Sequence, residues 1–210
     1  MATRVFSTKN LVTAAVFGIM CFIGTYIWPL FLIYLATLIG HYFVTVHHVA
    51  SGEPGLPTPS DVSDHWSDII GRSVRGIACA MLGLVPLVLY VQYVDRTPRV
   101  TAILAMLTIG QLYMPAVVLS VALTNTYWAA ISPVTWVRVI ARAPAGYIRF
   151  VGIWIASATV ALGLFRTWMI YGDSFVGGAI LGAVWTLYWF AHAVLVGEYI
   201  RSNAEKLGWE

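Results

Sequence analysis

The apolar stretch "LVTAAVFGIMCFIGTYIWPLFLIYLATLIGHYFVTVHH", residues 11–48, decides the fold of this chain. As one helix it would measure roughly 57 Å, nearly twice the ~30 Å hydrocarbon core of a bilayer. Pro29 lacks a backbone donor and disfavours helical geometry at the residue before it, and Trp28 prefers the membrane interface. The stretch therefore predicts two spans, 11–27 and 30–48, joined by a turn at the membrane surface. Because the first span is short, a re-entrant hairpin is the alternative.

The composition extends this interpretation to the whole chain. The sequence is 60% hydrophobic and only 10% charged, and its mean hydropathy is +0.80. A soluble domain carries roughly 25% charged residues, and backbone groups inside a bilayer must be satisfied within a helix. We therefore expect an all-α integral membrane protein that forms one transmembrane domain over residues 1–210. The expected spans are 11–27, 30–48, 76–94, 102–124, 148–170 and 175–197.

The distribution of basic residues favours six crossings. Six spans leave nine arginines and lysines on the side of both termini and three on the other side. The positive-inside rule then predicts a bacterial-type inner membrane with both termini in the cytoplasm. Treating residues 11–48 as one span would give five against seven and would lose this bias. The nine are Arg4, Lys9, Arg72, Arg75, Arg138, Arg142, Arg149, Arg201 and Lys206, and the three are Arg96, Arg99 and Arg166.

The first polar connector, "HHVASGEPGLPTPSDVSDHWSDIIGRSVRG" (47–76), predicts a short amphipathic helix on the membrane surface. Thr58 is placed to cap it and Pro59 to begin it. Four polar side chains on one face could share a divalent cation, since carboxylates with an imidazole suit Mn, Fe or Zn. The alternative is that acids near a helix N-terminus complement its dipole and keep one face wet. The four are Asp61, Asp64, His65 and Asp68.

The second connector, "NTYWAAISPVTWVRVIARAPAGYIRF" (125–150), predicts a second interfacial amphipathic helix. Ser132 is placed to cap it and Pro133 to begin it. We expect its arginines to point toward lipid headgroups or acidic groups. Its apolar face would comprise Val134, Trp136, Val137 and Ile140, and the arginines are Arg138, Arg142 and Arg149.

Two histidines fall inside predicted spans, where ionisable groups are costly. His41 and His192 lie at a similar depth from the side of the termini. They could ligate a haem between two helices or contact a quinone. Alternatively, both are neutral imidazoles bonded to backbone or hydroxyl groups at helix contacts. The nearby aromatic run "WTLYWFAH" (185–192) indicates a packing or lipid-facing surface, or else a cradle for a pigment or quinone. The sequence requires no cofactor.

Motifs of known chemistry are missing from the sequence. It holds no Walker motif, nucleophile elbow or HExxH, so no enzyme class is supported, and no polar pathway of a channel or ion-coupled transporter is visible. The net charge of +3 reflects loop arginines rather than a nucleic-acid surface. Small residues recur at the spacing of closely packed helices, in the pairs Gly76–Ala80, Thr159–Gly163 and Gly178–Gly182.

These features together favour a non-enzymatic accessory or scaffold subunit of a larger membrane complex. Its expected partners are the lipid bilayer and other membrane subunits or a second copy, with no nucleic acid. A small-molecule transporter or carrier is one alternative, and a haem- or quinone-binding electron-transfer subunit is another.

Two stretches of the chain indicate a weak internal repeat. "YIWPLFLIYLATLIGHYF" (26–43) and "LYMPAVVLSVALTNTYW" (112–128) both run from an aromatic residue near a proline through apolar residues to an aromatic pair. If this is more than chance, residues 11–95 and 100–197 form a parallel repeat of a three-helix unit.

The segment "GHYFVTVHHVASGEPGLPTPSDVSDHWSDIIGR" (40–72) resembles an uncharacterised family of bacterial and archaeal polytopic membrane proteins. That family carries a Gly-Tyr-type span end, a Gly-Glu-x-x-Leu-Pro loop and a spaced series of aspartates. Here His41 interrupts the Gly-Tyr step, and Val62 stands where an aromatic residue is expected. Since the family has no known function, the resemblance implies a topology and no chemistry. The matching positions are Gly40, Tyr42, Gly52, Glu53, Leu56, Pro57, Asp61, Asp64 and Asp68.

Overall fold

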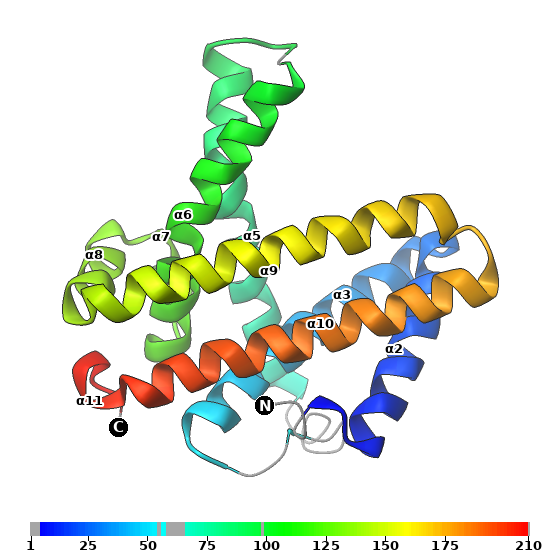
Figure 1. Cartoon of the computed structure of the whole chain (residues 1–210), viewed down its shortest axis with the longest axis horizontal. Helices are drawn as coiled ribbons and strands as arrows, with labels where there is room; N and C mark the ends of the chain where they lie inside the picture. Colours follow the sequence, from blue (N-terminus) through cyan, green and yellow to red (C-terminus); the bar gives the residue numbers. More distant parts are fainter. Residues whose placement is uncertain (1–4, 54–55, 58–65, 98, 210) are drawn as a thin grey trace. The chain divides into compact units, whose positions relative to one another are not determined.

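The computed structural model describes residues 5–53, 56–57, 66–97 and 99–209, and all regular structure in these ranges is helical (Figure 1). Within these ranges, six helices are long and apolar enough to cross a membrane, which confirms an all-α polytopic membrane protein. These are α2 (Thr8–Tyr26), α3 (Trp28–Ala50), α5 (Trp66–Tyr93), α6 (Val100–Thr124), α9 (Pro144–Tyr171) and α10 (Phe175–Ser202). Shorter helices are α7 (Trp128–Ile131), α8 (Pro133–Arg142) and α11 (Ala204–Leu207).

The break between the first two spans falls at the predicted Trp28–Pro29 step. Ile27, with φ −123° and ψ 89°, is the single residue between α2 and α3. Pro29 lies in the first turn of α3, where its missing N–H would have no partner inside the helix. Gly24 allows the chain to fold back, since a Cβ there would lie 2.8 Å from the Cα of Phe31. The long apolar stretch therefore forms two helices, of 19 and 23 residues.

The second interfacial helix is present as α8, which begins at Pro133 directly after Ser132. Trp136 stacks on Tyr113, with ring centroids 5.6 Å apart, and its Nε1 donates to the Ala129 carbonyl at 2.9 Å. The first connector differs from the prediction. Its residues 66–72 are the first turns of α5 and continue into the span, because no proline interrupts them. Residues 58–65 lie outside the described part of the chain.

The chain divides into two compact units, each described by itself. Unit 1 comprises Met1–Ser73 and Ser157–Ser202, and unit 2 comprises Val74–Ala156 and Asn203–Glu210. We expected a single domain with a repeat over 11–95 and 100–197. The boundaries of the units do not follow that repeat, which stays a prediction.

In unit 1, α10 packs against both α2 and α3, and these two pack against each other (Figure 1). Glycines allow the close approach. A Cβ on Gly182 would lie 2.8 Å from the Gly18 carbonyl oxygen of α2, and one on Gly197 would lie 2.7 Å from the Cβ of Val49. Without a hydrophobic drive between helices in lipid, such close van der Waals contact stabilises the packing. The largest fully buried side chains here include Tyr34, Phe190, Ile200, His41, Val46 and Val194.

In unit 2, α6 packs against α7 and α8. Trp154 Nε1 donates to Gln111 Oε1 at 2.9 Å, so the one amide inside the fourth predicted span is bonded. Arg142 donates to the Leu207 carbonyl at 2.6 Å. Its positive charge lies at the C-terminus of α11, where a cation is favourable. Arg142 therefore binds the end of α11, and its contact with an acidic group or a lipid headgroup stays a prediction.

Candidate functional site

The two intramembrane histidines both lie in unit 1, at the contact between α3 and α10. His41 is 2% exposed and His192 is 5% exposed. Each Nδ1 meets a hydroxyl group: His41 lies 3.1 Å from Thr45 Oγ1, and His192 lies 2.9 Å from the hydroxyl of Tyr42. This geometry matches the alternative of imidazoles bonded to hydroxyl groups at a helix contact.

Aromatic rings fill the space around the pair. The His41 ring stacks on Phe190, with centroids 4.8 Å apart, and the His192 ring lies over Tyr42 at 5.7 Å. Further along, Gly197 of α10 touches Val49 of α3. Because the two helices are in direct contact at the pair and at Gly197, this packing does not favour a haem plane between them.

The predicted metal ligands fall at the edge of what the structure describes. Asp61, Asp64 and His65 lie outside the described residues, and Asp68 lies on α5 in a turn whose side chains are not described. Among the side chains that the structure describes, no group of three or more His, Cys, Asp or Glu residues could hold a metal ion. The cation site in the first connector therefore stays a prediction.

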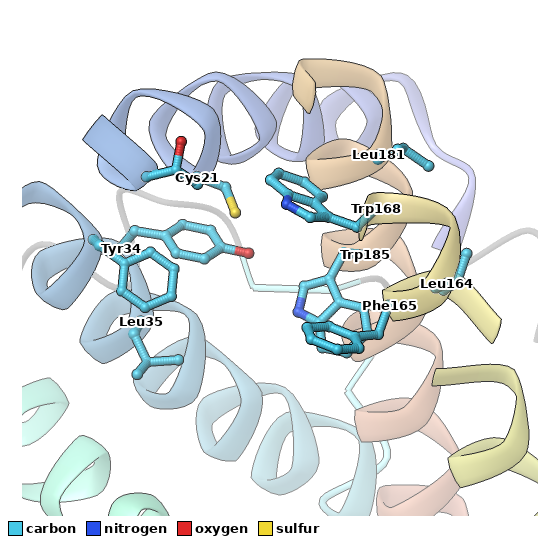
Figure 2. Close-up of a pocket in the computed structure, with 10 residues that line it drawn as sticks. Cys21, Tyr34, Leu35, Leu164, Phe165, Trp168, Leu181 and Trp185 are labelled. Carbon is cyan, nitrogen blue, oxygen red and sulfur yellow. The ribbon is translucent and has the colours of Figure 1, made fainter. Parts of the chain in front are cut away.

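Unit 1 also contains a cavity of about 310 Å³ between α2, α3, α9 and α10 (Figure 2). It lies near the end of the unit where α2 turns into α3 and α9 into α10, since the Tyr26 hydroxyl bonds to the Asp173 carbonyl at 3.5 Å. Tyr34 is seven residues beyond the Ile27 turn, or about 10 Å along the helix, so the cavity lies within the membrane-spanning part. Its principal lining residues are Cys21, Phe31, Tyr34, Phe165, Trp168 and Trp185.

The lining of the cavity is mostly apolar, and its polar side-chain groups include the Tyr34 hydroxyl and two indole N–H groups, which can all donate hydrogen bonds. Tyr34 is 2% exposed, and within the described part of the chain its hydroxyl completes no hydrogen bond, although Cys21 and Thr186 are its polar neighbours. Figure 2 shows this hydroxyl and the Cys21 sulfur directed into the cavity. Across it, the indole nitrogens of Trp168 and Trp185 lie on the side that faces Tyr34. None of the lining residues is charged.

Sequence reasoning found this cavity only in part. It singled out Trp185 through the aromatic run 185–192. Tyr34 and Trp168 were missed. A usable signal was that Tyr34 lies inside an apolar span, seven residues before His41 and therefore on the same helix face, where its hydroxyl needs a partner.

Comparison with protein-family models, with curated proteins and with solved structures gave no match to this chain. The resemblance of residues 40–72 to an uncharacterised membrane-protein family therefore stays an expectation.

Proposed function

We propose that this chain is a non-enzymatic accessory subunit that packs laterally, through α9, against a transmembrane helix of a different membrane protein. The support comes from two pairs of small residues with the same spacing, one buried against a neighbouring helix and the other exposed. On α10, Gly182 lies against Gly18, and Gly178 lies against Phe22. On α9, Thr159 and Gly163 are exposed.

The exposed Gly163 on α9 is the single observation that carries the proposal. A Cβ on Gly163 would meet nothing within 4 Å, whereas Gly178 and Gly182 of α10 touch α2. Only 11% of the apolar window of α9 is buried, against 39% in α10. A small-residue face on a membrane helix is where another helix backbone can approach closely. Val160, Leu162 and Ile170, all exposed, flank or extend this face.

The charge on the same face argues for a different protein rather than a second copy. Arg166 is exposed and lies one turn beyond Gly163, on the Thr159–Gly163 face. In a dimer with its two-fold axis along the membrane normal, both α9 helices would run the same way and bring the two Arg166 side chains together. A partner helix with a carboxylate at that level would neutralise the charge instead.

Mild-detergent purification of the tagged full chain tests this proposal. We expect a heteromeric complex, and we expect Gly163→Leu to lower the yield of the partner by about tenfold, a change worth ~1.4 kcal/mol. Ala105→Leu is the matched control, since Ala105 is an exposed small residue on another span. This control should keep the partner. A wild-type chain that is isolated only as a monomer or a homodimer would contradict the proposal, as would a partner that Gly163→Leu retains in full.

The bias of nine basic residues against three supports a bacterial-type inner membrane with both termini in the cytoplasm. Cysteine labelling of intact cells tests this orientation. Native Cys21 and Cys79 are buried, so they should contribute little background. With an impermeant reagent, we expect Arg96→Cys to be labelled and Ser202→Cys to be protected, since both positions are exposed in the fold. The reverse pattern would invert the orientation.

A further inference from the structure

The size of the cavity in unit 1 restricts what it can hold. At about 310 Å³ it is near the lower end of ligand pockets. It is also about twice the volume of an engineered apolar cavity, ~150 Å³, that takes up benzene. One substituted ring fits such a space, and a whole lipid does not.

The rim of the cavity faces the outside of unit 1. Phe165 of α9 is 56% exposed, and Leu164 and Leu181 beside it are partly exposed. Because these residues belong to membrane-spanning segments, a ligand would enter from the acyl chains of the bilayer rather than from water. An apolar tail on the ligand can then stay among the lipids while its ring is bound.

The polar groups define the chemistry of that ring. The buried Tyr34 hydroxyl completes no hydrogen bond within the described part of the chain, and a donor left in this state is costly. The indole N–H groups of Trp168 and Trp185 line the same space, on the side facing Tyr34 (Figure 2). Three donors without a charged neighbour suit a neutral ligand that carries oxygen acceptors.

The walls favour a flat ligand over an acyl chain. Tyr34, Trp168 and Trp185, together with Phe31 and Phe165, surround the space with aromatic faces and edges. Aromatic side chains prefer stacked or edge-to-face contacts with another ring. A hydrocarbon chain would fill the volume but leave all three donors unused.

We propose that this cavity binds the ring of a neutral, membrane-soluble carbonyl compound of the quinone class, with Tyr34 donating to one carbonyl oxygen. Binding needs neither His41 nor His192. It is independent of the proposed partner helix, because Leu164, Phe165 and Trp168 lie on a different face of α9 from Thr159 and Gly163.

Titration of the purified full chain in detergent with a decyl-substituted benzoquinone tests the inference, with calorimetry as the readout. Decylbenzene, which has the same tail and no carbonyl, is the matched ligand. We expect saturable binding of the quinone, at least tenfold tighter than that of decylbenzene. Equal binding of the two would overturn the proposal, and this comparison needs no variant.

Single-atom variants locate the contact. We expect Tyr34→Phe to weaken quinone binding about fivefold, as loss of one hydrogen bond predicts. Tyr93→Phe is the control, since Tyr93 is an exposed tyrosine in unit 2, and it should bind as the wild type does. Thermal unfolding of both variants verifies the fold. A folded Tyr34→Phe protein with wild-type affinity would refute the assigned contact.

Solvent extraction of the protein purified from its native membrane gives a second, independent readout. Mass spectrometry should detect a quinone-class compound in the extract of the wild type, and less of it in that of Tyr34→Phe. An extract with phospholipid alone would count against the proposal.

Discussion

Helices α9 and α10 have the same length, 28 residues, and similar apolar composition, yet they lie in different surroundings. In α10, Gly178, Gly182 and Gly197 are buried against α2 or α3, whereas in α9 Gly163 faces open space and Trp168 lines a cavity. The spacing of small residues is the same in both helices. What differs is the facing helix, because Gly18 lies opposite Gly182 and nothing within the described residues lies opposite Gly163. Close packing is thus a property of two matched faces.

The largest effect should come from breaking the matched face. In Gly182→Val the new Cβ would collide with the backbone of Gly18, so α2 and α10 must separate. We expect the free energy of unfolding to fall by about 3 kcal/mol, as in overpacked cores. Unfolding of the detergent-solubilised protein, followed by circular dichroism, measures this. Ile180→Val on the exposed side of α10 is the control and should change little.

A smaller effect should follow from loss of the polar link between α3 and α10. Tyr42→Phe removes the hydroxyl that lies 2.9 Å from His192 Nδ1. We expect a loss of about 1 kcal/mol, because hydrogen bonds inside membrane proteins contribute modestly. The same unfolding measurement applies. A loss as large as that of Gly182→Val would mean that this bond, rather than the glycine contact, holds α10 in place.

The link between α10 and α9 should matter less for overall stability. The Tyr188 hydroxyl donates to the Ser157 carbonyl at 3.0 Å. We expect Tyr188→Phe to lower stability by about 0.6 kcal/mol, the average for such bonds in membranes. Hydrogen–deuterium exchange should rise within residues 157–171 and stay unchanged in α2. A rise in α2 as well would show that α9 is held as firmly as α10.

The smallest effect should come from the open face. Gly163→Val places its side chain in empty space, so we expect the stability of the isolated chain to change by less than ~0.5 kcal/mol. The unfolding midpoint in detergent measures this. A clear loss of stability would show that α9 has a neighbour in the isolated chain at this position, and would end the contrast with Gly182.

Most of the fold could be predicted because length and hydropathy set the spans. The Trp28–Pro29 break and the start of α8 at Pro133 follow from the missing N–H of proline. Helix α9 begins at Pro144, four residues before the predicted 148, because the flank Pro-Ala-Gly-Tyr (144–147) is too weakly apolar for a hydropathy criterion. Likewise Ser67 and Asp68 lower the hydropathy of the first turns of α5.

Less of the site could be predicted, because it depends on how helices rotate against each other. His41 and His192 were singled out as polar groups inside apolar helices. Thr45, four residues after His41 on α3, follows from helix spacing, whereas the contact of His192 with Tyr42 depends on the facing of α3 and α10. The cavity is harder still. It exists where side chains of four helices leave space unfilled, and no pattern within one helix, not even the run 185–192, encodes that volume.

The one-residue connection at Ile27 has a consequence for how the protein is made. Since only Ile27 joins α2 to α3, one helix cannot cross the bilayer while the other stays in the aqueous phase away from the membrane. The two must enter the membrane together, as a preformed hairpin, during synthesis. Extra residues inserted after Ile27 would uncouple the two helices and shift Cys21 relative to Tyr34. A connection of this kind tolerates insertions in other membrane proteins, but here its length is fixed.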